Sequence, residues 1–424
     1  MISMSSVLLS SVCALSLVPL LGEVAGKAAG GVVHQLAQDI RDNYVFPEIG
    51  QRAADYLLER DESGAYDDLD GQQLAMTLTE DLRTYTNDLH FGVDLLPPNW
   101  QEMESEDLAD RRPNTTPNGF MRVERLDGNI GYLDLDGFMQ VDSARDNTHA
   151  AMQLLNGSSA LIFDLRDNGG GDPETVQLIT SYLFDPDEPV HLNSLYFRPT
   201  DETTEYWTHD DIKVENAMPD VPVYVLTSGY TFSAAEEFSY NLQCLKRATI
   251  IGETTGGGAH PVDGFVLDDR FVVNIPVGRA INPITKTNWE GTGVTPNIEV
   301  PAQDALERAK ITILTQLVEN GDDSAKWGLI KLKSQTDPIL LDADTLSEYA
   351  GQYTDRELVV ENDSLMYRRK GRPNWNRLIA VDVDQFVIDG FDGFLMTFER
   401  RKDGSIARIV GSYIQGHSDT SERE

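Results

Sequence analysis

A serine at the start of a predicted helix is the first residue in this chain that could do chemistry. The stretch "VYVLTSGYTFSAAEEFSYNL" has the pattern of a strand, a turn and a helix, and Ser233 falls where the helix begins. A serine there can cap free backbone amides, and Glu236 completes the spacing of a capping box. The same position suits a nucleophile, because a helix N-terminus stabilises developing negative charge. The local sequence favours the cap and leaves the nucleophile open.

A second strand and turn, "FDLRDNGGGDPETV", could supply an oxyanion site. Gly169, Gly170 and Gly171 permit backbone conformations that other residues avoid, and amides in such a turn can bind an oxyanion or a phosphate. Neither the Walker spacing nor the dinucleotide-binding spacing is present. A plain tight turn is the favoured interpretation of this stretch when it is taken alone.

Two histidines are candidate general bases. His90 lies in "TYTNDLHFGV", between a helical pattern and a short strand, and His260 lies in "GGGAHP". A lone histidine is more often structural than catalytic. The seven histidines show neither an H-x-x-x-H pair nor a Cys/His cluster, so we expect no metal and no cofactor.

The elements that must position these residues follow from the hydrophobic pattern. Residues 27–112 have helical spacing and end in a polar, Pro-rich linker. Residues 113–325 alternate short apolar strands with helices, which predicts an α/β domain with a largely parallel sheet. Residues 337–424 carry short strands about ten residues apart, which predicts an antiparallel meander or small barrel. We expect the last stretch, "HSDTSERE", to be disordered.

Composition restricts the partners and the compartment. The 424 residues carry a formal net charge of −36, which argues against nucleic acid and anionic membranes as partners. Residues 1–26 have the apolar run of a signal peptide rather than a stable membrane anchor, so we expect export to a periplasmic or extracellular location. Cys13 and Cys244 are the only cysteines, which excludes a disulfide scaffold.

Four stretches in order resemble the tail-specific, or C-terminal-processing, serine peptidase family. They read "DLRDNGGG", "TSGYTFSAAEEF", "RATIIGETTGGG" and "NWEGTGVTPNIEV", and the resemblance covers roughly residues 129–300. The segment ending in "NDLHFGV" is similar to bacterial relatives of interphotoreceptor retinoid-binding protein. The resemblance implies a crotonase/Clp-protease-like ββα core and a peptide or protein substrate. Fewer than forty residues separate Val93 from Asn129, too few for the family's usual PDZ domain.

The resemblance also suggests which residues catalyse. Well-known members use a Ser–Lys dyad, but Gly258 stands where that lysine would be. Tricorn-like members use histidine and glutamate instead, which implies Ser233 as nucleophile, His90 as base and Glu290 as its support. Those members have a serine beside the histidine, where this chain has Leu89. His260 is the second candidate base.

The oxyanion would then be bound by backbone amides at the two turns. The resemblance places the amide of Ala234 on one side of it and that of Gly169 or Gly170 on the other.

Two other functions fit the same residues. The retinoid-binding relatives show that this scaffold can carry apolar ligands, and the missing lysine fits a non-catalytic binding protein. An acyl hydrolase acting on esters would need the same catalytic parts as a peptidase. The sequence does not determine the oligomeric state.

Overall fold

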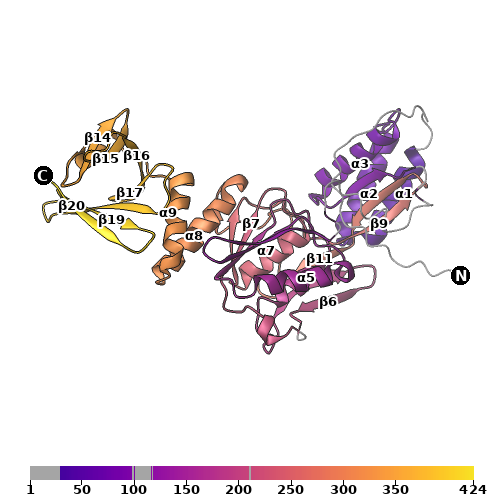
Figure 1. Ribbon diagram of the computed structural model, residues 1–424. Helices are drawn as coiled ribbons and strands as arrows, with labels where there is room; N and C mark the ends of the chain where they lie inside the picture. The colour runs from indigo at the N-terminus through magenta and orange to yellow at the C-terminus, as the bar shows by residue number, and fades with distance from the viewer. Residues whose placement is uncertain (1–28, 98–99, 101–115, 117, 210–211) are drawn as a thin grey trace. The chain divides into compact units, whose positions relative to one another are not determined.

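The computed structural model describes residues 29–97, 100, 116, 118–209 and 212–424 (Figure 1). The chain divides into two compact units between Ala305 and Leu306. Each unit buries its own hydrophobic clusters. The predicted signal peptide lies outside the described residues, and none of the helices within them is long and apolar enough to span a bilayer.

A six-stranded sheet forms the centre of the first unit. Its strand order is β12-β8-β7-β4-β3-β2, and every pairing is parallel except that of β2 with β3. The central strands read "ALIFD" and "VYVLT" and are buried along their whole length, as expected for a sheet covered on both faces. The strands are β2 (Phe120–Leu126), β3 (Ile130–Leu135), β4 (Ala160–Asp164), β7 (Val223–Thr227), β8 (Ala248–Gly252) and β12 (Ile298–Glu299).

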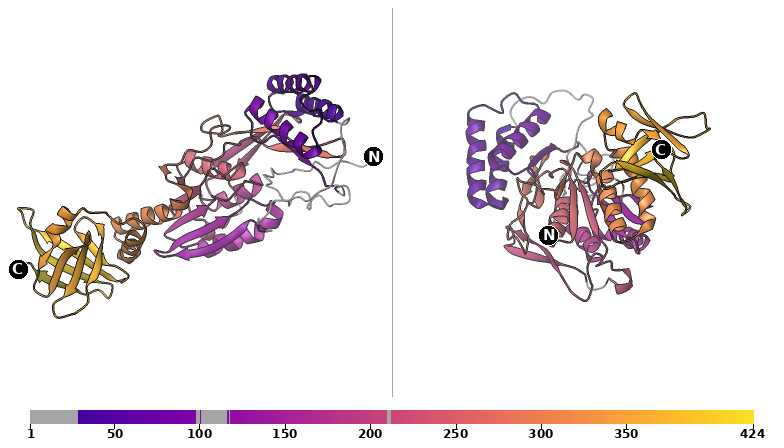
Figure 2. Two further views of the ribbon diagram at one scale, coloured as in Figure 1. Left: turned by 90° about the horizontal axis from the view of Figure 1, so that it is seen from above. Right: turned by 90° about the vertical axis from the view of Figure 1, so that its left-hand side faces the viewer.

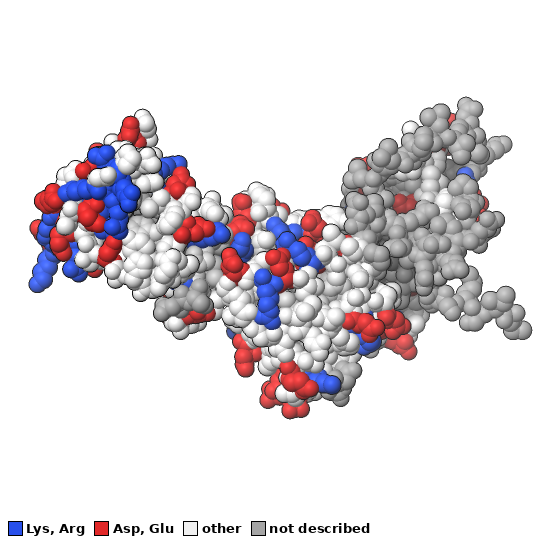
Figure 3. Space-filling model, in the orientation of Figure 1, with Lys and Arg blue, Asp and Glu red and all other residues white. Residues whose placement is uncertain are grey.

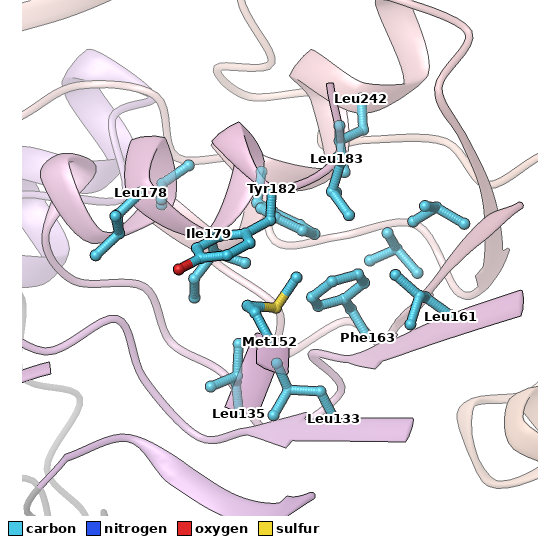
Figure 4. Packing of buried hydrophobic residues seen from close by; sticks show 14 of the residues in the cluster. Leu133, Leu135, Met152, Leu161, Phe163, Leu178, Ile179, Tyr182, Leu183 and Leu242 are labelled. Atoms are coloured by element: carbon cyan, nitrogen blue, oxygen red, sulfur yellow. The ribbon is translucent and has the colours of Figure 1, made fainter. Parts of the chain in front are cut away.

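Three helices cover this sheet and close its core. They are α5 (Val141–Leu155), α6 (Pro173–Ser181) and α7 (Ala234–Cys244). Figure 4 shows Met152 of α5 beside Phe163 and Leu133 of the strands, and Ile179 of α6 and Leu242 of α7 belong to the same cluster. The predicted α/β fold with a largely parallel sheet is therefore confirmed, and the carboxyl ends of β4, β7 and β8 lie along one edge, where ligand sites of such sheets form.

A second, three-stranded sheet lies in the same unit with the order β11-β5-β6. Its strands are β5 (His191–Phe197), β6 (Glu202–Trp207) and β11 (Gly278–Ile281), and both pairings are antiparallel. Two short 3₁₀ helices complete the connections, η2 (Val214–Asn216) and η3 (Ala302–Asp304).

The N-terminal helices share their core with a hairpin that comes much later in the chain. The helices are α1 (Ala29–Asn43), α2 (Pro47–Glu62) and α3 (Gly71–Thr86). They pack on an antiparallel sheet of order β1-β10-β9, with β1 (Gly92–Leu95), β9 (Val262–Leu267) and β10 (Phe271–Pro276). Two distant segments of sequence therefore build one hydrophobic cluster.

The second unit combines three helices with an eight-stranded antiparallel sheet. The helices are α8 (Ala305–Glu319), α9 (Asp323–Thr336) and α10 (Ala343–Tyr349). The strands follow in sequence order: β13 (Gly351–Gln352), β14 (Arg356–Glu361), β15 (Ser364–Arg369), β16 (Asn376–Asp382), β17 (Gln385–Ile388), β18 (Phe394–Arg400), β19 (Ile406–Tyr413) and β20 (Ser418–Glu422).

This sheet curls until its ends meet, as the predicted small barrel requires (Figure 2). An antiparallel bridge joins Tyr353, after β13, to Arg423, after β20. The expectation that "HSDTSERE" is disordered was wrong. Residues Ser418–Glu422 form β20, because a polar strand with one buried residue, Ser421, can still complete a barrel edge through backbone hydrogen bonds.

The negative charge is unevenly divided between the two units. Residues 1–305 hold 49 of the 70 acidic residues and 18 of the 34 basic ones, and so carry −31 of the net −36. On the face shown in Figure 3, basic side chains lie among the acidic ones over the C-terminal unit. The acid excess is therefore a property of the unit that contains the candidate site.

Candidate active site

Ser233 lies at a sharp bend between β7 and α7. Its backbone has φ 53° and ψ −121°, a strained conformation for a residue with a side chain. Such strain persists only where the surrounding structure enforces it, and it often marks a site of function. The residue also directly precedes the first turn of α7, where unpaired amides favour negative charge. The helix cap and the candidate nucleophile are therefore the same residue, Ser233.

The glycine turn after β4 packs directly against this bend. A Cβ added to Gly170 would lie 2.7 Å from the Cβ of Ser233 and 2.9 Å from the amide nitrogen of Ala234. Only glycine allows so close an approach, and Gly170 also has a φ of 103°. The Gly170 amide donates to Oδ1 of Asn168 at 2.8 Å, so this donor already has a partner. Ala234 and Gly169 are then the better candidates for binding an oxyanion.

The buried carboxylate of Glu236 ties the bend to the loop after β8. It accepts hydrogen bonds from the amides of Ser233 (2.8 Å), Gly257 (2.7 Å) and Gly258 (2.8 Å), and from the hydroxyl of Thr255 (2.5 Å). Burial raises the pKa of Glu236 to about 7, despite these four donors. The first of the four bonds is one half of the capping box that the sequence predicted.

His90 fills the space that Gly258 leaves open. A Cβ on Gly258 would lie 2.4 Å from Cε1 of His90 and 2.2 Å from Cζ of Phe232, and the two rings themselves contact at 4.6 Å between centroids. His90 is only 3% exposed, and neither ring nitrogen has a hydrogen-bond partner among the described residues. Burial lowers the pKa of His90 to about 4, so the imidazole is neutral at neutral pH.

His260 belongs to a buried network around Asp88. Its Nδ1 lies 2.6 Å from Oδ2 of Asp88 and 3.4 Å from Oε2 of Glu290, and the hydroxyl of Tyr44 donates to Asp88 at 3.2 Å. Burial lowers the pKa of His260, but the hydrogen bond and charge of Asp88 outweigh it and the pKa is raised. His260 is thus held in place by Asp88, with a pKa above its ordinary value.

Glu290 approaches both histidines from the loop between β11 and β12. Its Oε2 accepts the amide of Ala259 at 2.5 Å, whereas Oε1 is buried without a partner among the described residues. Burial, and then the charge of Asp88, raise the pKa of Glu290 to about 8. Side-chain atoms of Asp88, His90 and Glu290 lie within 4.8 Å of one another.

A cleft of about 510 Å³ opens beside this network. Its walls include Phe46, Asp88, His260, Arg279, Lys286 and Glu290. The guanidinium of Arg279 stacks over Phe46 and Tyr196, at 5.9 and 5.5 Å from the ring centroids. The cleft is mixed in charge and offers both cationic and carboxylate groups to a ligand.

The structure gathers the predicted residues into two neighbouring groups. Ser233, Ala234 and Gly170 are in one, and His260 and Glu290 are in the other. His90 lies between them, against Phe232 on one side and near Glu290 on the other. No hydrogen bond joins the Ser233 hydroxyl to either imidazole in the part of the chain that the structure describes.

Sequence reasoning did not assign a role to Asp88 or Tyr44. Asp88 stands two residues before His90 in "NDLHFG", a spacing that could have drawn attention to it. Tyr44 offers no local signal, because its contact with Asp88 joins residues 44 positions apart.

Two family models match the chain. Residues 129–300 match peptidase family S41, and residues 25–130 match the N-terminal domain of this family in eukaryotic IRBP. The chain is also similar to carboxyl-terminal-processing peptidase 2, chloroplastic, of Arabidopsis thaliana, with 31% identity over 176 residues, which cover 41% of this chain and 32% of that protein. Similarity to a carboxyl-terminal-processing protease of Synechocystis sp. is 29% over 184 residues, covering 43% and 40%. The chain thus spans well under half the length of these relatives.

The comparison with solved structures also found two peptidases. The tricorn protease superposes with a TM-score of 0.47 and 14% identity over 69% of this chain and 36% of the other. A photosystem II D1 C-terminal processing protease gives a TM-score of 0.41 and 16% identity over 65% and 94%. Taken together, the two family matches cover residues 25–300: residues 129–300 are similar to peptidase family S41, and residues 25–130 are similar to the N-terminal domain of that family.

Proposed function

We propose that this protein is a serine peptidase that cleaves peptide bonds through an acyl-enzyme on Ser233. The observation that carries the proposal is the strained backbone of Ser233 at the start of α7, with the glycine turn packed against it. In this reaction the Ser233 hydroxyl attacks the scissile carbonyl while its proton passes to a base. The amides of Ala234 and Gly169 bind the resulting oxyanion, each contributing a few kcal/mol by analogy with other oxyanion holes.

His90 is the base in this proposal. Its ring contacts Phe232, the residue before the nucleophile, and both of its nitrogens are without hydrogen-bond partners among the described residues, so they are available for proton transfer. A neutral imidazole is the form that accepts a proton. Glu290, close to His90, orients or assists this base, directly or through a neighbour. His260 is the alternative base, and its Nδ1 contact with Asp88 resembles the His–Asp pair of other serine hydrolases.

The substrate in this proposal is a peptide or protein. Support comes from the peptidase family match and from relatives that are named as processing peptidases. We extend the proposal to an exported location, on the strength of the apolar run in residues 1–26.

A fluorophosphonate probe tests the nucleophile directly. Purified protein should be labelled on Ser233, and Ser233→Ala should abolish labelling. Ser239→Ala is the matched control, because Ser239 is buried in the same helix and donates only to the carbonyl of Ala235. No labelling of the folded wild type would refute the serine hydrolase.

Paired substrates separate the remaining functions. A peptide library and an ester library, each compared with Ser233→Ala, distinguish a peptidase from an esterase. Titration with fatty acids or retinoids tests the alternative of an apolar-ligand carrier. Micromolar binding that persists in Ser233→Ala, without cleavage of any peptide, would favour the carrier.

A further inference from the structure

Three side chains beside the nucleophile form a compact set of metal-ligand types. Asp88 and His90 come from the connection between α3 and β1, and Glu290 comes from the loop before β12. One ligand atom from each lies within 4.8 Å of the other two. Nδ1 of His90 is 4.0 Å from Oδ1 of Asp88.

Two of these side chains carry buried polar atoms that have no partner. Both ring nitrogens of His90, which is 97% buried, and Oε1 of Glu290 lack hydrogen bonds among the described residues. Buried polar groups in folded proteins are nearly always satisfied, because each unpaired one costs about 1–3 kcal/mol. A single cation between them would satisfy an imidazole nitrogen and a carboxylate oxygen together.

The two carboxyl groups of the set lie beside His260, which is 2.6 Å from Asp88, and the adjoining cleft also holds Arg279 and Lys286. Asp88 and Glu290 have ion-pair contacts only with His90 and His260 among the described residues, and with no lysine or arginine. The unit that contains them carries −31 of the net charge, which raises the local concentration of cations.

We propose that Asp88, His90 and Glu290 bind one divalent cation of the zinc class. One imidazole and two carboxylates suit Zn²⁺, whereas Mg²⁺ prefers oxygen ligands and water. Ligand atoms around a tetrahedral zinc lie about 3.3 Å apart, so the side chains must close by about an ångström. A bound cation would occupy the base, so zinc inhibits the enzyme. This consequence rests on the proposed function, whereas the binding does not.

Binding is measured without any catalysis, in the Ser233→Ala protein. Zinc chloride is titrated by calorimetry and by competition with a chromogenic chelator. The expected result is one Zn²⁺ per chain, with affinity reduced more than about tenfold by His90→Gln and by Glu290→Gln. His417→Ala, in the C-terminal unit, is the control that keeps full affinity. Circular dichroism and thermal melts establish that each variant is folded, and Zn²⁺ should raise the melting temperature only where the site is intact.

Several results would overturn the site. They are the absence of Zn²⁺ binding below about 100 μM, equal affinity in His90→Gln, or equal affinity for Mg²⁺. The inhibitory consequence is tested by fluorophosphonate labelling of wild type, which Zn²⁺ should slow and EDTA restore. Unchanged labelling of zinc-loaded protein would overturn that consequence. Failure of the proposed function gives a different result. The wild-type protein would then not react with the fluorophosphonate even without zinc, and the zinc titration would still show whether the metal site exists.

Discussion

The two sides of the candidate site are built in opposite ways. On the nucleophile side, the amide of Ser233 donates to the buried Glu236 carboxylate, and Gly170 packs directly against the Ser233 side chain. On the base side, Asp88 and His90 come from one segment and Glu290 from a remote one, and His90 and Glu290 keep buried atoms without partners among the described residues. Ser233, the proposed nucleophile, is fixed by these contacts, whereas the proposed base His90 has ring nitrogens without partners among the described residues.

This difference suggests that one side of the site positions the Ser233 hydroxyl and the other side transfers its proton. A strained, fully bonded bend fixes where attack occurs. Unpartnered groups such as the nitrogens of His90 are free to bond to the reacting serine, to solvent or to a cation. Apo geometry of catalytic hydrogen bonds is often loose, so the open base side is compatible with activity. The predictions that follow test whether the two sides really divide the work in this way.

The largest expected effect comes from removing the base. His90→Ala should lower the rate of fluorophosphonate labelling by about 10³-fold, because proton removal from Ser233 would be lost. His260→Ala should lower it less than about tenfold, since that ring is engaged with Asp88. The reverse order of the two effects would make His260 the base.

The pH dependence of wild-type labelling distinguishes the same two residues. A general base must be unprotonated, so the rate falls as pH drops through its pKa. Burial lowers the pKa of His90 to about 4, so if His90 is the base, labelling of Ser233 should persist down to about pH 5. The pKa of His260 is raised, so a rate that already falls above about pH 6.5 would indicate His260.

Breaking the bonds on the nucleophile side should cost activity and stability together. Glu236→Gln leaves one carbonyl oxygen for four donors, so we expect about 10²-fold slower labelling and about 2 kcal/mol less stability. Glu237→Gln is the matched control, since Glu237 is the next residue and is also buried. Labelling and urea unfolding of both variants provide the comparison, and equal rates would remove Glu236 from the positioning of Ser233.

A methyl group added at Gly258 should perturb the contact of His90 with Phe232, which joins the two sides of the site. In Gly258→Ala the new Cβ would overlap both His90 and Phe232, and we expect a loss of about 1–3 kcal/mol with about tenfold slower labelling. Gly256→Ala overlaps Phe232 at 2.7 Å but not His90, so it should lose stability with less effect on rate. Equal rates in the two variants would show that the place of His90 against Gly258 is unimportant.

The smallest effect is a pH-dependent stability on the base side. The pKa of Glu290 is raised to about 8 in the folded chain, so the proton it holds stabilises the fold fully below its unfolded pKa. That stability is lost as pH rises through about 8. Wild type should therefore lose about 1–2 kcal/mol more than Glu290→Gln between about pH 5 and about pH 9, as measured by urea unfolding. If the unfolding free energies of the two proteins changed equally with pH, Glu290 would not be a buried, protonated carboxyl.

Sequence reasoning succeeded where the signal was local. The structure contains the strand, turn and helix predicted around Ser233 and the glycine turn predicted after "LIFD". The C-terminal strands form the expected antiparallel sheet. Each of these features depends on residues a few positions apart, which is the range over which propensity and hydrophobic pattern act.

Features that depend on distant residues escaped prediction. The bond between Asp88 and His260 spans 172 positions, and the carboxylate of Glu236 reaches a loop some twenty residues away. Strand β20 was missed because its polar sequence becomes ordered only through pairing with β19. The catalytic assignments of Ser233, His90, His260 and Glu290 stay predictions, since no hydrogen bond joins either imidazole to the Ser233 hydroxyl among the described residues.

The sheet β1-β10-β9 restricts how the gene segments that encode this protein can be recombined. One of its strands follows His90 and another follows His260, while the matched family models divide the chain near residue 130. A recombination event at that division would bring together a β1 and a β9–β10 hairpin from different parents. The apolar faces that meet in this sheet would then have to fit by chance. Shuffling of this family by gene exchange should therefore be tolerated only when residues 29–95 and 262–276 travel together.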